Sequence, residues 1–299
     1  MLFFCSENSK KLRSEDIKIL PCARVYIYSP VLTKCYDAGC ETMSQKVNPR
    51  ESKEYMTHRG VGNPQIQEIA PGVFVVTKLV HFFAKIGVNA GIIQTPNAVI
   101  FIDSGMSAYS GAYLWNFAKK RMNSTEDLYL ILTHKDTDHC FGMNEIRKHG
   151  ATVIAHEHTA EIIHSWHDLS KNPIAKRVRK QFHPDDVLGE VILSRPDQTI
   201  ICDTTLNLGD EIQLLSIPGH TPGDIAVYHP KSKVLFAGDA ILEGMDPFVR
   251  PDSINIKTWI RNLQRLKELD IEWILPGHGE LSKPDIIDSN ILFLMSEQS

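Results

Sequence analysis

A run of histidine and aspartate directly after an apolar stretch constrains this 299-residue chain more than any other feature. The apolar stretch Leu128–Thr133 reads as a strand and leads into His134-Lys135-Asp136-Thr137-Asp138-His139. In an extended loop, alternate residues from position 134 fall on one side of the chain, and position 139 joins them at the turn into a helix. Imidazole and carboxylate groups gathered in this way suit zinc, iron or manganese. The segment predicts a metal site at the edge of a sheet.

Three later segments repeat the arrangement of an apolar strand followed by a metal-ligand type of side chain. Glycines flank each of these side chains and let the backbone approach closely. Four strand ends that deliver such groups are hard to explain as ordinary polar loops, so the sequence predicts one metal centre built from four loops. The three later segments are Pro218–Asp224 around His220, Ala237–Ala240 around Asp239, and Pro276–Glu280 around His278.

The order of predicted elements indicates two packed sheets with helices on the outside. Strands and then a helix occur in two successive blocks along the chain, a pattern typical of layered α and β structure. The expected strands cover residues 67–70, 73–78, 88–95, 99–103, 128–133, 152–155, 199–203, 212–217, 224–229, 234–237 and 272–275. The expected helices cover residues 107–122, 254–269 and 283–295, and a further helix before the strand at 152–155 is expected to end at Gly150. Residues 158–190 also have a helical tendency.

The first 65 residues differ from the rest of the chain. They hold ten basic and seven acidic residues, whereas the whole chain carries a net charge of −4. They also contain four of the six cysteines, at spacings that include no C-x-x-C pair and fit no standard zinc module. Apart from a strand-like stretch at Val25–Tyr28, they show no sustained periodicity. We expect an N-terminal extension over 1–65 and a single metal-binding domain over 66–299.

Composition and charge exclude several classes of protein. The negative net charge argues against nucleic acid or a membrane surface as the main partner. Apolar runs such as Ala98–Ile102 are far shorter than the ~20 residues of a membrane span. Residues 1–7 contain no basic leader, so we expect a cytoplasmic protein with reduced thiols that acts on a small-molecule substrate. Oligomeric state stays open, with a homodimer as one outcome.

These motifs make the chain from about residue 66 to 285 resemble the metallo-β-lactamase superfamily. That family combines H-x-H-x-D-H with later P-G-H-T-x-G, G-D and P-G-H-G segments. The resemblance implies an α+β fold, a four-layer αββα sandwich of two mixed β-sheets flanked by helices. The sequence matches every element except one, because Asp136 stands where the family has its second histidine.

The resemblance also implies a ligand set for two divalent metal ions, either zinc or iron, with manganese as a further choice. Asp103 would orient ligands from outside the metal centre, and Asp138 would also act in catalysis by positioning a bridging hydroxide. The first metal would take His134, Asp136 and His220, the second would take Asp138, His139 and His278, and Asp239 would bridge both.

Asp136 changes the charge expected at this centre. A carboxylate in place of an imidazole brings the sum of two metals, Asp138, Asp239 and a hydroxide to zero. A more neutral cluster raises the pKa of its bound water and shifts the metal preference from zinc towards iron or manganese. Flavodiiron proteins, a redox branch that resembles this family, carry a glutamate at the same motif position. Metal identity and the filling of the first site stay open.

Three functions follow from the sequence. The leading hypothesis is a metal-dependent hydrolase that uses a metal-bridging hydroxide on an ester, thioester, amide or phosphoester. The second is a diiron redox protein that handles oxygen or nitric oxide with a separate electron donor, because the chain is too short for a flavin domain. The third is a degenerate, non-catalytic metal-binding protein.

The substrate pocket is the least defined part of the sequence prediction. His81-Phe82-Phe83 lies between two expected strands, where the family often has a flap, so Phe82 and Phe83 are candidate substrate contacts or core residues. Phe248, in the loop Glu243–Arg250, is a third candidate. The basic run Lys176–Lys180 could hold an anionic group, although a solvated helix face is the simpler interpretation.

Overall fold

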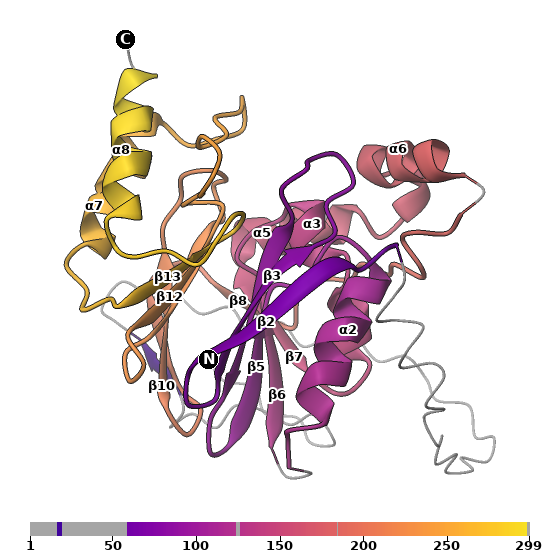
Figure 1. The fold of residues 1–299 in the computed structure, drawn as a ribbon, viewed down its shortest axis with the longest axis horizontal. Coiled ribbons are helices and arrows are strands. Elements are labelled where there is room, and N and C mark those ends of the chain that lie inside the picture. The colour runs from indigo at the N-terminus through magenta and orange to yellow at the C-terminus, as the bar shows by residue number, and fades with distance from the viewer. Residues whose placement is uncertain (1–16, 20–58, 124–125, 184, 298–299) are drawn as a thin grey trace, which may run out of the picture.

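A computed structural model describes residues 17–19, 59–123, 126–183 and 185–297, and these form two β-sheets with helices on both outer faces (Figure 1). The seven-stranded sheet has the order β2-β3-β4-β5-β6-β7-β8, and the six-stranded sheet has the order β1-β9-β10-β11-β12-β13. Both sheets are mixed, since parallel pairs such as β5–β6 and β12–β13 stand beside antiparallel ones. The four-layer αββα architecture expected from the sequence is confirmed.

The seven-stranded sheet is built from the first half of the domain. Its strands are β2 Gly62–Ala70, β3 Val73–Leu79, β4 Val88–Gln94, β5 Ala98–Ile102, β6 Asp127–Ile131, β7 Thr152–His156 and β8 Gln198–Ile200. The helices that follow these strands are α2 Ala108–Lys119, α3 Thr137–Cys140, α4 Met143–Arg147, α5 Glu157–Ser165 and α6 Pro173–Phe182, with a short 3₁₀ turn at Leu169–Lys171.

The six-stranded sheet takes the second half of the chain. Its strands are β1 Ile17–Ile19, β9 Thr204–Asn207, β10 Glu211–Ser216, β11 Ile225–His229, β12 Val234–Gly238 and β13 Trp273–Pro276. Helices α7 Ile256–Leu266 and α8 Ile286–Ser296 cover its outer face, and α2 covers the outer face of the other sheet (Figure 1). Trp259 of α7 is fully buried there, and its Nε1 donates a hydrogen bond of 3.0 Å to the Ala240 carbonyl.

Apolar side chains from both sheets fill the space between them. Ile100 and Ile131 of the seven-stranded sheet share one cluster with Leu214 and Phe236 of the six-stranded sheet, and all four are buried. Gly91 of β4 lies so close to the Phe236 ring that a Cβ at position 91 would stand 2.3 Å from Cε1 of the ring. A glycine at this point lets the two sheets meet around one aromatic side chain.

The structure differs from the sequence prediction in three places. Strand β2 begins at Gly62 instead of residue 67, because Gly62 already pairs with Leu79 of β3. The strand expected over 199–203 ends earlier, at Ile200 of β8, because the chain then crosses to the other sheet and continues there as β9. The helix expected to end at Gly150 is split into α3 and α4 around Gly142, where a Cβ would lie 2.1 Å from the Ser104 carbonyl oxygen.

The stretch Val25–Tyr28 and the four N-terminal cysteines lie outside the described residues, so the domain boundary near residue 65 stays a prediction. Of the two later cysteines, Cys140 is a buried free thiol and Cys202 is half-buried. Within the described residues, every helix is too short or too polar to cross a lipid bilayer.

We expect Phe236→Ala to destabilise the protein by about 3–5 kcal/mol, because it removes a buried ring from between the sheets and leaves a cavity. The measurement is the free energy of unfolding in urea. Leu292→Ala is the control, since Leu292 on α8 is 68% exposed and its truncation should change the stability by less than about 0.5 kcal/mol. Equal effects of the two substitutions would contradict the packing described here.

Candidate metal centre

Four loops bring the histidines and aspartates predicted from the sequence to one edge of the two sheets. The loops follow β6, β10, β12 and β13, and α3 carries two of the side chains at the upper ends of the strands in Figure 1. The side chains form two groups, and within each group the potential ligand atoms all lie within 4.8 Å of one another. The first group is His134, Asp136, His220 and Asp239, and the second is Asp138, His139 and His278.

In the second group the imidazole nitrogens surround carboxylate oxygens. Nε2 of His278 lies 3.2 Å from Oδ2 of Asp138, and Nε2 of His139 lies 3.4 Å from the same oxygen. Oδ1 of Asp239 approaches the same two nitrogens, at 3.1 Å from His139 and 3.5 Å from His278. Asp239, a member of the first group, therefore also contacts the histidines of the second group.

The first group is arranged around the other oxygen of Asp239. Oδ2 of Asp239 lies 3.6 Å from Nε2 of His220 and 3.8 Å from Nε2 of His134. Oδ2 of Asp136 lies 3.1 Å from Nε2 of His220 and 3.6 Å from Nε2 of His134. Each oxygen of Asp239 thus faces a different group, which is the placement that a bridging ligand requires.

The Nδ1 atom of each of the four histidines is oriented by an oxygen outside the cluster. In each ring Nδ1 lies within hydrogen-bond distance of an oxygen outside the cluster, so we assign Nδ1 as the donor to that oxygen, which directs Nε2 inward. Histidines that bind metals in proteins are commonly oriented by such an outer acceptor. The acceptors are Thr133 Oγ1 for His134 at 3.0 Å, Asp103 Oδ2 for His139 at 2.8 Å, the Phe248 carbonyl for His220 at 3.1 Å, and the Gly87 carbonyl for His278 at 2.9 Å.

Asp103 links two of these histidines. Its carboxylate accepts hydrogen bonds from the Thr133 amide at 2.8 Å and the Thr133 hydroxyl at 2.7 Å, besides contacting His139. Because the Thr133 hydroxyl donates to Asp103, its oxygen is free to accept from His134. Asp103 has a φ of 61°, a left-handed conformation that is uncommon for a residue with a side chain. This strand-end aspartate lies where the sequence placed an orienting group.

A glycine beside the cluster allows the backbone to approach a carboxylate closely. A Cβ at Gly277 would stand 1.9 Å from Oδ1 of Asp239, so any larger residue would displace that side chain. The neighbouring Gly238 has a φ of 52° directly before Asp239. Steric constraints thus explain why glycine stands at positions 238 and 277, next to Asp239 and His278.

The buried polar atoms of the cluster fit a cation. Nε2 of His134, Nε2 of His139 and Oδ1 of Asp239 are buried and have no hydrogen-bond partner. A buried polar atom without a partner is costly in an isolated protein. Three such atoms, all of ligand type and all facing one small volume, fit divalent metal ions held by nitrogen and oxygen donors.

The electrostatics of the cluster indicate the same need for positive charge. Burial alone would lower the pKa of His278, but the carboxylates of Asp239 and Asp138 raise it to about 10. Burial alone would raise the pKa of Asp239, yet the surrounding histidines hold it well below its usual range. Without a metal, the buried carboxylates therefore keep protons on His139 and His278 at neutral pH.

Asp136 has partners that the sequence did not predict. The guanidinium of Arg250 contacts both of its oxygens, with Nη1 at 2.7 Å from Oδ2 and Nη2 at 3.3 Å from Oδ1. Lys135 Nζ lies 3.2 Å from Oδ1 of the same carboxylate. The charge sum made from the sequence omitted Arg250, which offsets the extra negative charge of Asp136. Because of Arg250, the carboxylate of Asp136 does not by itself make the charge of the metal centre zero.

His81 is a second residue whose position the sequence left unassigned. It lies in the loop between β3 and β4, and its Nδ1 accepts hydrogen bonds from the amides of Ala84 at 2.8 Å and Phe83 at 3.3 Å. Burial lowers its pKa, partly opposed by Asp138, so the ring is neutral with its proton on Nε2. Nε2 lies 3.7 Å from Oδ2 of Asp138, so the ring of His81 directs its N–H towards the second group.

The three phenylalanines named from the sequence have different surroundings. Phe82 is buried and packs on Phe182 of α6, with ring centroids 5.2 Å apart. Phe83 lies beside His81, at a centroid distance of 6.2 Å, and the guanidinium of Arg177 lies 4.1 Å from its ring centre. Phe248 contributes its carbonyl to the cluster while its ring is 58% exposed. Their contact with a substrate stays a prediction.

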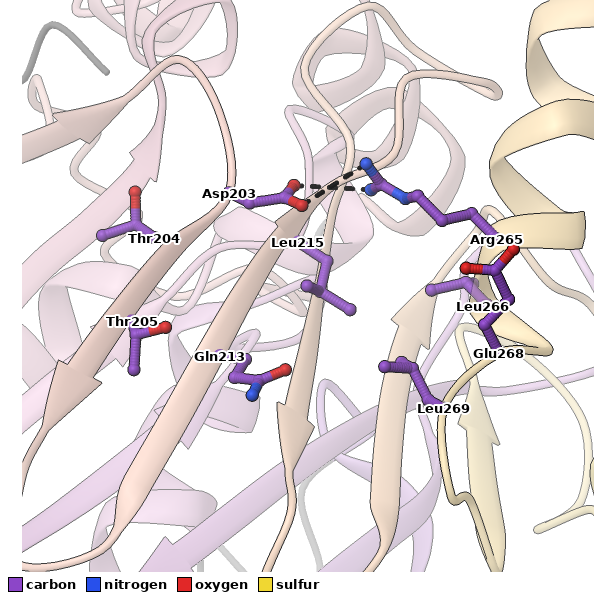
Figure 2. Close-up of a pocket in the computed structure, with 9 residues that line it drawn as sticks. All are labelled: Asp203, Thr204, Thr205, Gln213, Leu215, Arg265, Leu266, Glu268 and Leu269. Carbon is purple, nitrogen blue, oxygen red and sulfur yellow. Dashed lines mark hydrogen bonds and ion pairs between the residues drawn. The ribbon is translucent and has the colours of Figure 1, made fainter. Parts of the chain in front are cut away.

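A separate cavity of about 320 Å³ lies between β9, β10 and the C-terminal end of α7 (Figure 2). Figure 2 shows Asp203 facing Arg265 across its upper end, where Nη1 of the arginine lies 3.4 Å from Oδ2 of the aspartate. The residues that line this cavity include no member of either group of the metal centre.

Known proteins share these features. A family model described as the metallo-beta-lactamase superfamily matches residues 85–278, which contain all seven predicted ligands. The chain is 28% identical to the probable metallo-hydrolase YflN of Bacillus subtilis, over 69% of this chain and 86% of that protein. It is 25% identical to the human acyl-coenzyme A thioesterase MBLAC2, over 64% of this chain and 72% of that protein.

A solved structure of a metallo-beta-lactamase from Pontibacter korlensis has the same fold. It superposes with a TM-score of 0.60 at 20% sequence identity, covering 78% of this chain and 99% of that one. The family match extends over more than half of the chain and includes the whole predicted ligand set. The chain therefore belongs to the metallo-β-lactamase superfamily and is one of its metallo-hydrolases.

Proposed function

We propose that this protein hydrolyses an ester or thioester of a small molecule with the help of two divalent metal ions. The observation that carries the proposal is the buried cluster in which Nε2 of His134, Nε2 of His139 and Oδ1 of Asp239 have no hydrogen-bond partner. The first metal would be held by His134, Asp136 and His220, the second by Asp138, His139 and His278, and both by Asp239.

Metals held there would supply Lewis-acid chemistry and lower the pKa of water at neutral pH. The choice between zinc, iron and manganese belongs to this proposal, because histidine and carboxylate ligands suit all three. The surrounding side chains supply the remaining parts of hydrolysis, which are orientation and the handling of protons.

Asp138 and His81 have complementary roles in this proposal. The carboxylate of Asp138 accepts the proton of the attacking water, and no serine or cysteine nucleophile is required. His81 donates a hydrogen bond through Nε2 to the oxygen that becomes negative as the substrate carbonyl is attacked. The two backbone amides that bind Nδ1 keep this ring in the donating tautomer.

A thioester is the substrate class that the comparisons favour. The human relative is an acyl-coenzyme A thioesterase by name. Helix α6 also presents exposed basic residues next to the loop of His81, with Arg177 stacked on Phe83. Phosphate groups of a coenzyme A thioester would find positive charge at this position. Amides and phosphoesters are the other substrate classes to test.

The second candidate is a diiron redox protein. The observation that favours it is the carboxylate of Asp136 in the first group, since carboxylate ligands suit iron. Iron in the purified protein, together with consumption of oxygen or nitric oxide, would select this function. A protein that binds metal and shows neither activity would select the non-catalytic alternative.

Removal of the metals should abolish hydrolysis. We expect treatment with a chelator to reduce thioester hydrolysis to the background rate, and zinc, iron or manganese to restore it. The measurement is turnover on a panel of acyl-coenzyme A thioesters, chromogenic esters, lactams and phosphodiesters. Undiminished turnover after complete metal removal would contradict the proposal.

Asp138→Asn should lower kcat by ~10²–10⁴-fold, because the amide cannot accept the proton of water and binds metal less well. The measurement is kcat together with the metal content of the purified variant. Asp285→Asn is the control, since Asp285 is exposed and lies at the start of α8. Loss of activity in both variants would show that the effect is not specific to the cluster.

His81→Phe should lower kcat by about 10²-fold while the metal content stays unchanged, because the ring is kept and the Nε2 donor is lost. His81→Gln, which retains a donor, should recover part of this loss. His167→Phe is the control, since His167 is exposed just beyond the C-terminal end of α5. A loss of bound metal in His81→Phe would instead identify His81 as a ligand.

Metal binding should release protons at neutral pH. The metal-free protein keeps a proton on His278, whose pKa is raised to about 10, and this proton must leave before Nε2 can bind a metal. The apparent metal affinity should therefore rise as the pH increases from neutral towards 10. Calorimetric titration in buffers of different ionisation enthalpy should detect about one proton or more per chain. Identical heats in all buffers would contradict this prediction.

A further inference from the structure

A closed ring of ion pairs surrounds the carboxylate of Asp136. Arg250 and Lys135 both contact Asp136, and both also contact Asp252. Nζ of Lys135 lies 2.9 Å from Oδ2 of Asp252, and Nε of Arg250 lies 3.2 Å from Oδ1 of the same residue. Two cations and two anions thus alternate around the ring, and its net charge is zero.

Most of this ring is shielded from water. The side chains of Lys135, Asp136 and Arg250 are 11%, 16% and 19% exposed, whereas Asp252 is 51% exposed. Charges that are mostly buried are screened less by solvent and salt than charges on the surface. The positive charge of Arg250 therefore acts strongly on a cation that approaches Asp136.

In the described part of the chain, the second group has no lysine or arginine that offsets the negative charge of its aspartate, Asp138. Asp138 contacts nitrogens of His81, His139 and His278, and among the described residues no lysine or arginine forms an ion pair with it. The negative charge of Asp138 is thus available to a metal, while the negative charge of Asp136 is offset by Arg250. The two groups share Asp239, so this carboxylate does not distinguish them.

We propose that Arg250 makes the two metal sites unequal, so that the second site fills first and tightly and the first site binds its metal weakly. This inference rests on the metal centre proposed above and on no assumption about the substrate. The bound state of the protein would then contain one permanent metal and one exchangeable metal, whose occupancy follows the free metal concentration.

Arg250 also orients the carboxylate that it neutralises. Its two terminal nitrogens contact the two oxygens of Asp136 in a fork, a geometry that lysine cannot reproduce. Oδ2 remains directed at His220, at 3.1 Å from Nε2. Charge and orientation can be separated by substitution, because Arg250→Lys keeps the charge and loses the fork, and Arg250→Gln removes the charge.

The test is a titration of the metal-free full-length protein with Zn²⁺ in competition with a chromogenic chelator. In the wild-type protein we expect two equivalents whose dissociation constants differ by about tenfold or more. In Arg250→Gln the weaker constant should fall by about tenfold or more and the tighter one should not change. In Arg250→Lys the weaker site should remain weak. Circular dichroism establishes that each variant is folded.

Two further substitutions assign the equivalents to the sites. Asp138→Asn should abolish or weaken the tight equivalent, and Asp136→Asn should act on the weak one. Arg265→Gln is the matched control, because Arg265 pairs with Asp203 in the separate cavity of Figure 2 and should leave both constants unchanged. If Arg250→Gln does not fold, Asp252→Asn takes its place and should weaken the weak site further by removing a negative charge from the ring.

Two equivalents of equal affinity in the wild-type protein would overturn the inference, as would an unchanged weak constant in folded Arg250→Gln. Either result would leave the proposed hydrolase standing, since two filled sites are compatible with it. Failure of the wild-type protein to bind Zn²⁺, Fe²⁺ or Mn²⁺ would overturn both.

Discussion

The burial of several carboxylates in one small volume is the constraint on which the rest of this structure depends. Asp239 has one oxygen directed at each group of histidines, and Asp136 and Asp138 lie on either side of it. Like charges at such short range are tolerated only with positive charge between them. Protonated histidines supply that charge in the metal-free protein, and the proposed metals would supply it in the active one.

The fold provides the rigid frame that this cluster requires. Every contributing loop leaves a strand of one of the two sheets, and the apolar cluster around Phe236 holds the sheets together. Behind each histidine a fixed oxygen sets the ring orientation, so the inward atoms are positioned before any ligand arrives. The resulting arrangement is that of the metallo-β-lactamase superfamily, with one charged pair, Asp136 and Arg250, in place of a neutral histidine.

Much of this arrangement could be predicted from the sequence, because its signals are local. A strand of apolar residues that ends in histidine or aspartate beside glycine is visible at Phe236–Asp239 and at Leu275–His278 alike. Crossings between sheets leave no such signal, so the short strand Thr204–Asn207 has no counterpart in the sequence prediction. His81 also looked like part of an apolar flap, since only the folded loop brings the Phe83 and Ala84 amides to its Nδ1.

The sequence by itself determined the family, the two-sheet architecture and the set of residues from which the cluster is built, because strand periodicity and ligand spacing are properties of neighbouring residues. Only the tertiary structure decided the electrostatics of the first site. Arg250 and Asp136 are 114 positions apart in the chain, and a charge pair between such distant residues has no trace in local pattern. Their contact depends on how the loop after β12 packs against the loop after β6, and that packing sets the charge a metal would meet there.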